Sequence, residues 1–469
     1  MNIQKLNKYY DPFSVYSLFK DHEDSVFLDS SKEDSDMSRY SFIAVNPITK
    51  IVKTEKEVLV DGIKKSVNFF SELNKIINKY KLDYNSEIPF ISGMIGYISY
   101  DFSLGEGMKY SKYSSTFKIK KDEIVAVPEA VFALYENIII FDLINKNTYI
   151  SSLGVLKNQK VSIKEIIENN YSLISEKSIS DNSVKFKSDF NKKEYIDALD
   201  KLINYIKDGH IYVTNMTRRV ECDILSDSFD VYESLRKINK APFSAYMNYK
   251  DFQIISSSPE RFLNIVNRKV VTRPIKGTRP RGKSVVEDLK LRTELENSEK
   301  DKSELLMIVD LERNDLSKVC KINTVKVPEL FKIEEYSTVF HLVSTVEGIL
   351  KDNISSVDCI KECFPGGSIT GAPKLRSMEI INELEKSRRG IYTGIIGYFD
   401  LRGNADFNII IRTILKKDNK AVFGIGGGIT YESKKEEEWI ETIDKGKALI
   451  KALGKTHIRG EVQNEGNSI

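Results

Sequence analysis

The sequence has few cysteines, no long apolar run and almost no excess charge, and each absence narrows the class of protein. The four cysteines, at positions 222, 320, 359 and 363, form no paired framework. They are therefore expected to be buried thiols rather than disulfides or metal ligands. No apolar run approaches the ~18 residues that a membrane-spanning helix needs. The 71 basic residues against 68 acidic ones are too balanced to indicate nucleic-acid binding.

Targeting segments and repeats are also missing. The first residues, MNIQKLNKYYD, contain no apolar core of a secretory signal, so a cytoplasmic protein is expected. A chain of 469 residues with 41% hydrophobic and 30% charged residues is typical of a globular protein of two or three domains. We expect an N-terminal region over residues 1–180, a catalytic region over 189–455 and a polar tail over 456–469, with the boundary in the polar segment 178–189.

Local patterns predict helices mixed with antiparallel strands. Residues 57–65 form a hairpin pattern around Asp61-Gly62, and residues 132–152 form a second one that turns near 145–147. Apolar residues at three- and four-residue spacing predict a helix capped by Asp189 or Asn191. The remaining expected helices are 66–80, 161–177, 285–308, 373–386 and 435–451, and the expected strands of the second half are 211–222, 243–249, 252–257, 261–266, 269–272, 391–399, 407–415 and 421–425. This mixture predicts an α+β fold.

The segment TRPIKGTRPRG, residues 272–282, is unusual in combining four basic residues with two prolines and two glycines. Proline fixes φ and glycine lets the backbone approach a ligand closely. The segment is therefore predicted to be a stiff loop that holds Lys276 in a set place, although an ordinary basic surface loop fits these residues equally well.

Two acidic pairs lie on predicted helices. Asp301 and Glu304 are three residues apart, as are Glu438 and Glu441, so each pair shares one helical face. Either pair alone is more often a solvated surface stripe, and the acidic run 436–438 also suits a helix N-terminus.

Taken in order along the chain, six blocks resemble the chorismate-utilising enzymes, the family that includes anthranilate synthase component I and aminodeoxychorismate synthase component I. The blocks are SSSPERF (256–262), TRPIKGTRPRG, DLERNDL (310–316), STVFHLVSTVEG with His341, FPGGSITGAPK (364–374) and GIGGGIT (424–430). The resemblance runs from Asp189 to Ala452 and is looser over 27–30 and 38–47. It implies antiparallel sheets that form a sandwich flanked by helices.

Three positions bear on the branch of the family. Lys276, within PIKGT, and APFSAY at 241–246 resemble the branch that places nitrogen on C4 of chorismate for 4-aminobenzoate and folate synthesis. The alternative is the anthranilate branch, which has alanine in place of this lysine. Val213 stands where isochorismate and salicylate synthases carry a water-activating lysine. A binding protein that has kept the fold without turnover is the rival from another class.

The resemblance implies roles for individual residues. It implies Mg²⁺ held by Glu304 and Glu441, with Asp301 and Glu438 acting largely through water. Lys276 would add to C2 of chorismate and Glu260 would protonate the departing C4 hydroxyl, provided that burial raises its pKa. A neutral Lys276 amine requires a desolvated or cation-rich pocket, to which Arg273 and Arg279 would contribute. The remaining expected site residues are His341 at the reacting ring, Thr370 and Tyr392 at the substrate, Arg412 in a strand as a bidentate fork, and Gly427 and Gly428 as an anion-binding nest.

Partners follow from the same resemblance. The chain lacks a Cys-His-Glu glutaminase module, so ammonia is expected from a glutamine amidotransferase subunit in a heterodimer or from free ammonium. Family members also carry a tryptophan pocket in the N-terminal region. The matching positions are Ser30, Met37, Ser38, Arg39, Tyr40, Pro242, Phe243 and Ser244.

Overall fold

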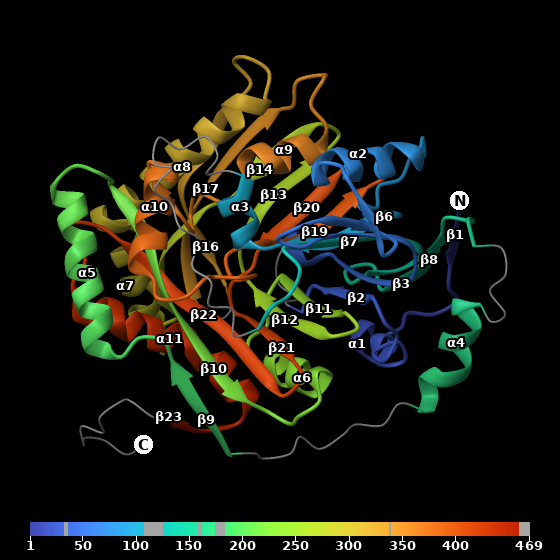
Figure 1. Ribbon diagram of the computed structural model, residues 1–469, viewed down its shortest axis with the longest axis horizontal. Helices are drawn as coiled ribbons and strands as arrows, with labels where there is room; N and C mark the ends of the chain where they lie inside the picture. The colour runs from blue at the N-terminus through green and yellow to red at the C-terminus, as the bar shows by residue number, and fades with distance from the viewer. Residues whose placement is uncertain (32–35, 107–124, 157–161, 174–182, 337–338, 459–469) are drawn as a thin grey trace.

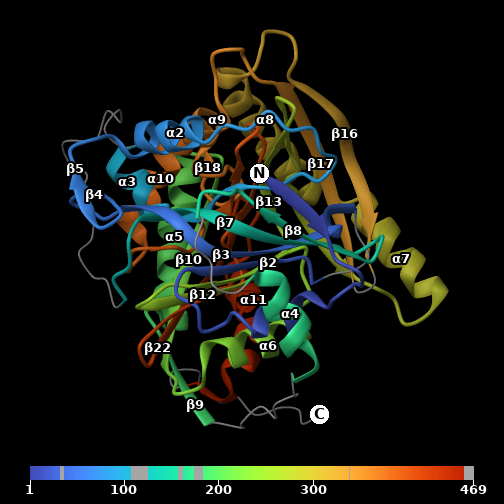
Figure 2. The ribbon, with the colours of Figure 1, turned by 90° about the vertical axis from the view of Figure 1, so that its right-hand side faces the viewer.

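The computed structural model describes residues 1–31, 36–106, 125–156, 162–173, 183–336 and 339–458, and it confirms the α+β prediction (Figures 1 and 2). Two long central strands pair with each other, β3 (Tyr40–Lys53) and β7 (Ala130–Asp142). A sheet extends from each of them, and we call these two extensions the wings. No helix in the described ranges is long and apolar enough to cross a membrane.

The first wing begins at β3 and is built mostly from the second half of the chain. Its strands pair in the order β2 (Ser25–Asp29), β11 (Phe243–Asn248), β12 (Phe252–Ser258), β21 (Thr413–Lys417), β22 (Lys420–Ile429), β10 (Val213–Asp223) and β9 (Ser183–Ser188), with β18 (Gly371–Ala372) on the end of β10 and β23 (Lys455–Ile458) beside β9. All of these pairings are antiparallel except β9 with β23.

The second wing begins at β7. Its strands pair in the order β6 (Gly93–Ile98), β19 (Ile395–Asp400), β20 (Ala405–Ile409), β13 (Arg261–Val266), β14 (Lys269–Thr272) and β17 (Val339–Ile349), with β15 (Ile275–Pro280) and β16 (Lys326–Glu335) both on β17. Strands on the outer edges are β8 (Asn147–Ser152) and β1 (Asn2–Lys5) beside β7, and β4 (Val58–Val60) and β5 (Ile63–Lys65) beside β3.

Helices cover both wings (Figure 1). In the first wing α11 (Lys435–Leu453) packs along β22, and in the second α8 (Glu299–Val319) packs along β17. The other helices are α1 (Pro12–Ser17), α2 (Phe69–Lys79), α3 (Tyr100–Glu106), α4 (Ile163–Asn170), α5 (Lys192–Lys207), α6 (Ser228–Ile238), α7 (Val285–Glu296), α9 (Ser356–Cys363) and α10 (Lys374–Leu384). The cap of α5 is Asn191, which forms a reciprocal capping box with Glu194.

Five predicted boundaries were wrong. The helix expected over 285–308 is two helices, because Ser298 caps a new one by accepting from the N–H of Asp301. The loop expected around Lys276 contains β15, which pairs with β17. The strand expected over 407–415 breaks at 410–412, and the one expected over 391–399 begins only at Ile395. The helix expected over 161–177 ends at Asn170, with a 3₁₀ turn to Leu173, and residues 174–177 lie outside the described residues.

Strands from residues 1–180 and from 189–455 share one hydrogen-bonded network, through β2 with β11 and β6 with β19. The division of the chain at residue 180 therefore stays a prediction. Of the predicted tail, residues 456–458 belong to strand β23, and residues 459–469 lie outside the described residues.

The chain passes between the wings at two places that lie side by side. Residues 259–260 connect β12 to β13, and residues 410–412 connect β20 to β21. The N–H of Ile409 donates to the carbonyl of Glu260 at 3.0 Å, and the hydroxyl of Ser258 donates to the carbonyl of Ile409 at 2.6 Å. We call these two segments the crossings. They fix the positions of Glu260 and Arg412 relative to each other.

The largest apolar cluster among the described residues brings together segments from the first and the second half of the chain. Phe132 of β7 is fully buried, and its ring lies 5.5 Å from that of Phe399 and 6.1 Å from that of Phe407. Phe132→Ala should lower the free energy of unfolding by about 3–5 kcal/mol, because a cavity opens between these segments. Urea unfolding followed by circular dichroism measures the change. The exposed Ile63→Ala serves as the control and should shift stability by no more than about 0.5 kcal/mol.

Candidate active site

A cavity of about 940 Å³ is lined by residues of both wings. Most of the predicted site residues line it, namely Lys276, Glu260, His341, Tyr392, Arg412, Gly428, Asp301, Glu304, Glu438 and Glu441. The structure thus brings together residues that lie up to 181 positions apart between Glu260 and Glu441. Thr370 and Gly427 are not among the residues that line the cavity.

Lys276 extends from β15 to the glycine-rich strand β22. A Cβ on Gly428 would lie 3.1 Å from the Lys276 Nζ, and one on Gly427 would lie 3.1 Å from Glu441 Oε1 and 3.3 Å from Glu438 Oε2. Glycine at these positions therefore lets the lysine and the two carboxylates approach the strand closely. Gly427 and Gly428 lie in the extended strand β22, paired with Met216 and Asn215 of β10, and their backbone N–H groups as an anion-binding nest stay a prediction.

The two arginines that were expected to surround Lys276 are occupied by carboxylates. Arg279 binds Glu294 at 2.9 Å and Asp301 at 3.2 Å, and Arg273 binds Glu334. Their charge is thus largely balanced locally. Arg279 still lines the cavity, whereas Arg273 does not.

Glu260 stands in the first crossing, at the wall of the cavity. Its Oε1 accepts a hydrogen bond of 2.6 Å from the hydroxyl of Ser368. Burial raises the pKa of Glu260, while the Ser368 hydrogen bond and the charge of Lys276 oppose that rise. The direction of this shift is the one that a general acid requires, and the role of Glu260 as that acid stays a prediction.

Arg412 stands in the second crossing rather than in a strand, with a φ of 50°. Its guanidinium donates to the side-chain oxygen of Asn239 at 3.3 Å, and in the described part of the chain it has no carboxylate within ion-pair distance. Burial lowers the pKa of Arg412. A buried guanidinium with only a neutral amide partner is arranged to receive an anionic group from a ligand.

The four predicted metal carboxylates approach the cavity from two helices, α8 and α11. Burial raises the pKa of Glu304 and of Glu438, and repulsion from Glu441 adds to both shifts. Glu441 is bound by Lys445 at 2.5 Å, and Asp301 is bound by Arg279. Within the described ranges, no three His, Cys, Asp or Glu side chains lie close enough together to hold a metal ion by themselves.

His341 and Thr370 occupy different environments. His341 lines the cavity, and its Nδ1 lies 2.9 Å from the hydroxyl of Thr278 on the neighbouring strand. The Thr370 side chain is fully buried and donates to the carbonyl of Gly366 at 2.8 Å. The predicted contact of its hydroxyl with the substrate is therefore not supported by its position.

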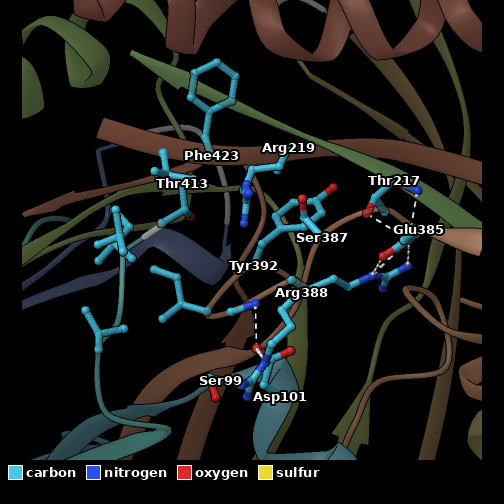
Figure 3. Close-up of a pocket in the computed structure, with 18 of the residues that line it drawn as sticks. Ser99, Asp101, Thr217, Arg219, Glu385, Ser387, Arg388, Tyr392, Thr413 and Phe423 are labelled. Atoms are coloured by element: carbon cyan, nitrogen blue, oxygen red, sulfur yellow. Dashed lines mark hydrogen bonds and ion pairs between the residues drawn. The ribbon is translucent and has the colours of Figure 1, made fainter. Parts of the chain in front are cut away.

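Tyr392 lines both the large cavity and a small one of about 70 Å³, whose lining residues Figure 3 shows. Asp101 and Arg388 form an ion pair of 2.9 Å at one side of the small cavity, and Glu385 accepts from Thr217 at the other. Gly424 packs flat against the Tyr392 ring, since a Cβ there would lie 2.2 Å from it.

The predicted N-terminal pocket is present as a cavity of about 360 Å³. Seven of the eight predicted residues line it, Ser30, Met37, Arg39, Tyr40, Pro242, Phe243 and Ser244, whereas Ser38 does not. Aromatic rings of Phe42 and Tyr398 complete the wall. Tryptophan as its ligand stays a prediction.

Among the lining residues of the large cavity that the sequence analysis did not identify are Ser368, Asn239 and Lys445. Ser368 lies inside a block that was identified, so its position two residues before Thr370 could have been considered. Lys445 lies one helical turn after Glu441 and could have been found by the i, i+4 rule. No pattern in the residues around Asn239 indicates that its side chain lines the cavity.

Comparison with known proteins agrees with this site. The family model described as chorismate binding enzyme matches residues 23–451. Anthranilate synthase component 1 of Lactococcus lactis is 34% identical over 94% of this chain and 96% of its own. Aminodeoxychorismate synthase component 1 of Bacillus subtilis is also 34% identical, over 88% of this chain and 89% of its own.

A solved structure shows the same fold. The anthranilate synthase component I from Streptococcus pneumoniae superposes with a TM-score of 0.78 at 29% identity, over 89% of this chain and 93% of its own. The match of the family model over most of the chain shows that this protein belongs to the chorismate-binding enzymes. The chain is equally similar to relatives named anthranilate synthase and aminodeoxychorismate synthase, so sequence identity does not distinguish between these two reactions.

Arg412→Lys should weaken chorismate binding, because a single ammonium cannot reproduce a planar fork. We expect the KM for chorismate to rise about 10- to 100-fold, as for loss of one hydrogen bond to a charged group. Steady-state consumption of chorismate measures this. The exposed Arg313→Lys on α8 is the matched control and should leave the KM unchanged. An unchanged KM in Arg412→Lys would exclude this role for Arg412.

Proposed function

We propose that this protein is an aminodeoxychorismate synthase component I, which converts chorismate and ammonia into 4-amino-4-deoxychorismate and water. The position of Lys276 carries the proposal, because a primary amine within the cavity is available as a nucleophile that an alanine could not replace. The product would feed the synthesis of 4-aminobenzoate and folate. Relatives bearing this name, from Bacillus subtilis and Escherichia coli, are each 34% identical to the chain.

In the first step the neutral Lys276 amine forms a bond to C2 of chorismate. The ring double bonds shift, and the C4–O bond breaks. Glu260 supplies the proton with which the hydroxyl leaves as water, since burial keeps this carboxyl protonated to higher pH than usual. Arg412 would hold one substrate carboxylate. Val213, 4.0 Å from the Cβ position of Gly428, offers no base that could activate water.

In the second step ammonia forms a bond to C4, the double bonds shift back, and the C2–N bond to Lys276 breaks. The Glu260 carboxylate takes up the proton that the new ammonium group loses, which restores the acid. The overall reaction exchanges a hydroxyl for an amino group, with one ammonia consumed and one water released. Ammonia would come from a glutamine amidotransferase subunit, with which the chain would form a heterodimer.

The carboxylates that α8 and α11 bring to the large cavity are suited to binding Mg²⁺. Carboxylates are hard oxygen donors of the kind that Mg²⁺ prefers, and repulsion from Glu441 raises the pKa of both Glu304 and Glu438. This ion commonly takes only one or two carboxylates, together with waters and substrate oxygens. Glu304 and Glu441 would hold it, with Glu438 and Asp301 beside them, once Lys445 releases Glu441. The ion would neutralise a substrate carboxylate.

Product identity tests the proposal. Wild-type protein, chorismate, Mg²⁺ and ammonium should give a product that a 4-amino-4-deoxychorismate lyase converts to 4-aminobenzoate, whereas glutamine without an amidotransferase should give none. Fluorescent anthranilate, with no 4-aminobenzoate after the lyase, would instead establish the anthranilate branch.

Lys276→Ala and Lys276→Arg test the covalent step. Lys276→Ala should lose 4-amino-4-deoxychorismate formation, and any remaining turnover should place nitrogen on C2. Lys276→Arg should also fail, because arginine keeps its proton. A Lys276→Arg variant with wild-type turnover would contradict the covalent step while leaving the product assignment intact. The exposed Lys237→Arg, on α6, serves as the control.

Metal dependence is tested at Glu304 and Glu441. Excess chelator should stop turnover, and Glu304→Gln or Glu441→Gln should nearly abolish both activity and the calorimetric signal of Mg²⁺ binding in the absence of chorismate. Glu436→Gln, on the exposed face of the same α11, should change neither. Near wild-type turnover in excess chelator would remove the metal from the mechanism.

A further inference from the structure

The segment Cys363–Ser368 connects the general acid to the helices of the second wing. Ser368 at its end donates to Glu260 Oε1 at 2.6 Å. Gly366 packs against Ile409, the residue whose N–H holds the Glu260 backbone, because a Cβ on Gly366 would lie 2.9 Å from the Ile409 side chain. The segment therefore contacts the acid through its side chain and, through Ile409, its backbone.

Helix α8 holds this segment at Gly367. A Cβ on Gly367 would lie 2.7 Å from Leu311 and 3.2 Å from Glu312 Oε1, so the backbone of Gly367 packs directly against the buried carboxyl, and the proximity of its N–H opposes the rise of the Glu312 pKa. Glu312 is only 4% exposed. Such a buried acceptor fixes the backbone next to Ser368, since its loss would leave an N–H unsatisfied.

A second contact holds the start of the segment. The Lys374 ammonium donates to Asp315 at 2.5 Å, to the carbonyl of Cys363 at 2.9 Å and to that of Pro365 at 2.7 Å. Asp315 lies one turn after Glu312 on α8 and is 1% exposed. The segment is thus tied to one helix at both ends.

We propose that Ser368 is the positioning residue of Glu260, fixing Oε1 so that Oε2 carries the acidic proton, and that Glu312 keeps Ser368 in place through Gly367. The proposal rests on the proposed role of Glu260 as general acid. Loss of the C4 hydroxyl is common to both amination reactions of chorismate, so the proposal can be tested whichever product forms.

The electrostatic consequence has a defined sign. A donor to a carboxylate stabilises the charged form, so the Ser368 hydrogen bond lowers the pKa that burial raises. Removing the hydroxyl should let Glu260 stay protonated to higher pH. The charged or titratable groups that face Glu260 are Lys276 of β15, Lys445 of α11, Arg412 of the second crossing, Tyr392 and Glu312 of α8.

Ser368→Ala is the decisive variant. Chorismate consumption under saturating ammonium and Mg²⁺ is measured as kcat and KM over a range of pH. We expect kcat to fall about 10-fold or more, as expected when a general acid is misplaced, with the KM unchanged and the alkaline limb of the kcat profile moved to higher pH. Ser368→Thr, which keeps the hydroxyl, should restore kcat and the limb.

Two variants of Glu312 test the support of the segment. Burial and the neighbouring Asp315 raise the pKa of Glu312 to about 8, so glutamine resembles its mostly neutral state at neutral pH. Glu312→Gln keeps an acceptor for Gly367 and should retain wild-type kcat, whereas Glu312→Ala should reproduce the Ser368→Ala pattern. Ser103→Ala, which removes a buried hydroxyl bonded at 2.6 Å elsewhere, should leave the pH profile unchanged.

Three outcomes would overturn the proposal. Ser368→Ala could retain the wild-type kcat, or it could lose kcat without moving the alkaline limb, which a merely structural role would produce. A wild-type pH profile of kcat in Glu312→Ala would show that Glu312 does not keep Ser368 in place. The identity of the wild-type product is measured separately, so failure of the proposed reaction is distinguished from failure of Ser368.

Discussion

The paired crossings between the two wings are the constraint on which the site depends. The two connections are joined by hydrogen bonds from Ile409 to Glu260 and from Ser258 to Ile409, which place Glu260 and Arg412 beside each other between the wings. Ser257 adds a third bond, from its N–H to the carbonyl of Arg412 at 3.2 Å. Backbone groups of each crossing are hydrogen-bonded to residues of the other or of its flanking strands. A shift of Glu260 would therefore also displace Arg412. The positive φ of Arg412 shows how sharply the chain turns there.

A buried ion pair beside the small cavity also holds two residues of the large cavity, Ile369 and Asn215. Arg389 binds Glu385 at 2.7 Å and also donates to the carbonyls of Ile369 and Asn215, both at 2.8 Å. Glu385 in turn accepts from the N–H and the hydroxyl of Thr217. Such a pair contributes little net stability but specifies one arrangement of the segments that it joins, and loss of one partner commonly costs about 3–5 kcal/mol.

Local signals predicted the elements that local interactions stabilise. The hairpin at Asp61-Gly62 has both residues at positive φ, and the capping box at Asn191 begins α5. The failures have a different cause. β15 forms because β17 is present to pair with it, and β20 and β21 separate at 410–412 because they belong to different wings. Neither partner is visible from a window of neighbouring residues.

The sequence by itself determined the family and the α+β class, and it indicated which residues line the cavity, since ordered blocks carry Lys276, Glu260 and the carboxylates. Only the tertiary structure decided which of these groups meet. It placed the hydroxyl of Ser368 on Glu260 and that of Thr370 on a backbone carbonyl, left Arg412 without an ion-paired carboxylate among the described residues, and bound Arg279 to Asp301. The reason is physical: a contact such as that of Ser368 with Glu260, 108 positions apart, forms only when distant parts of the chain assemble, and its geometry is set by packing rather than by spacing along the chain.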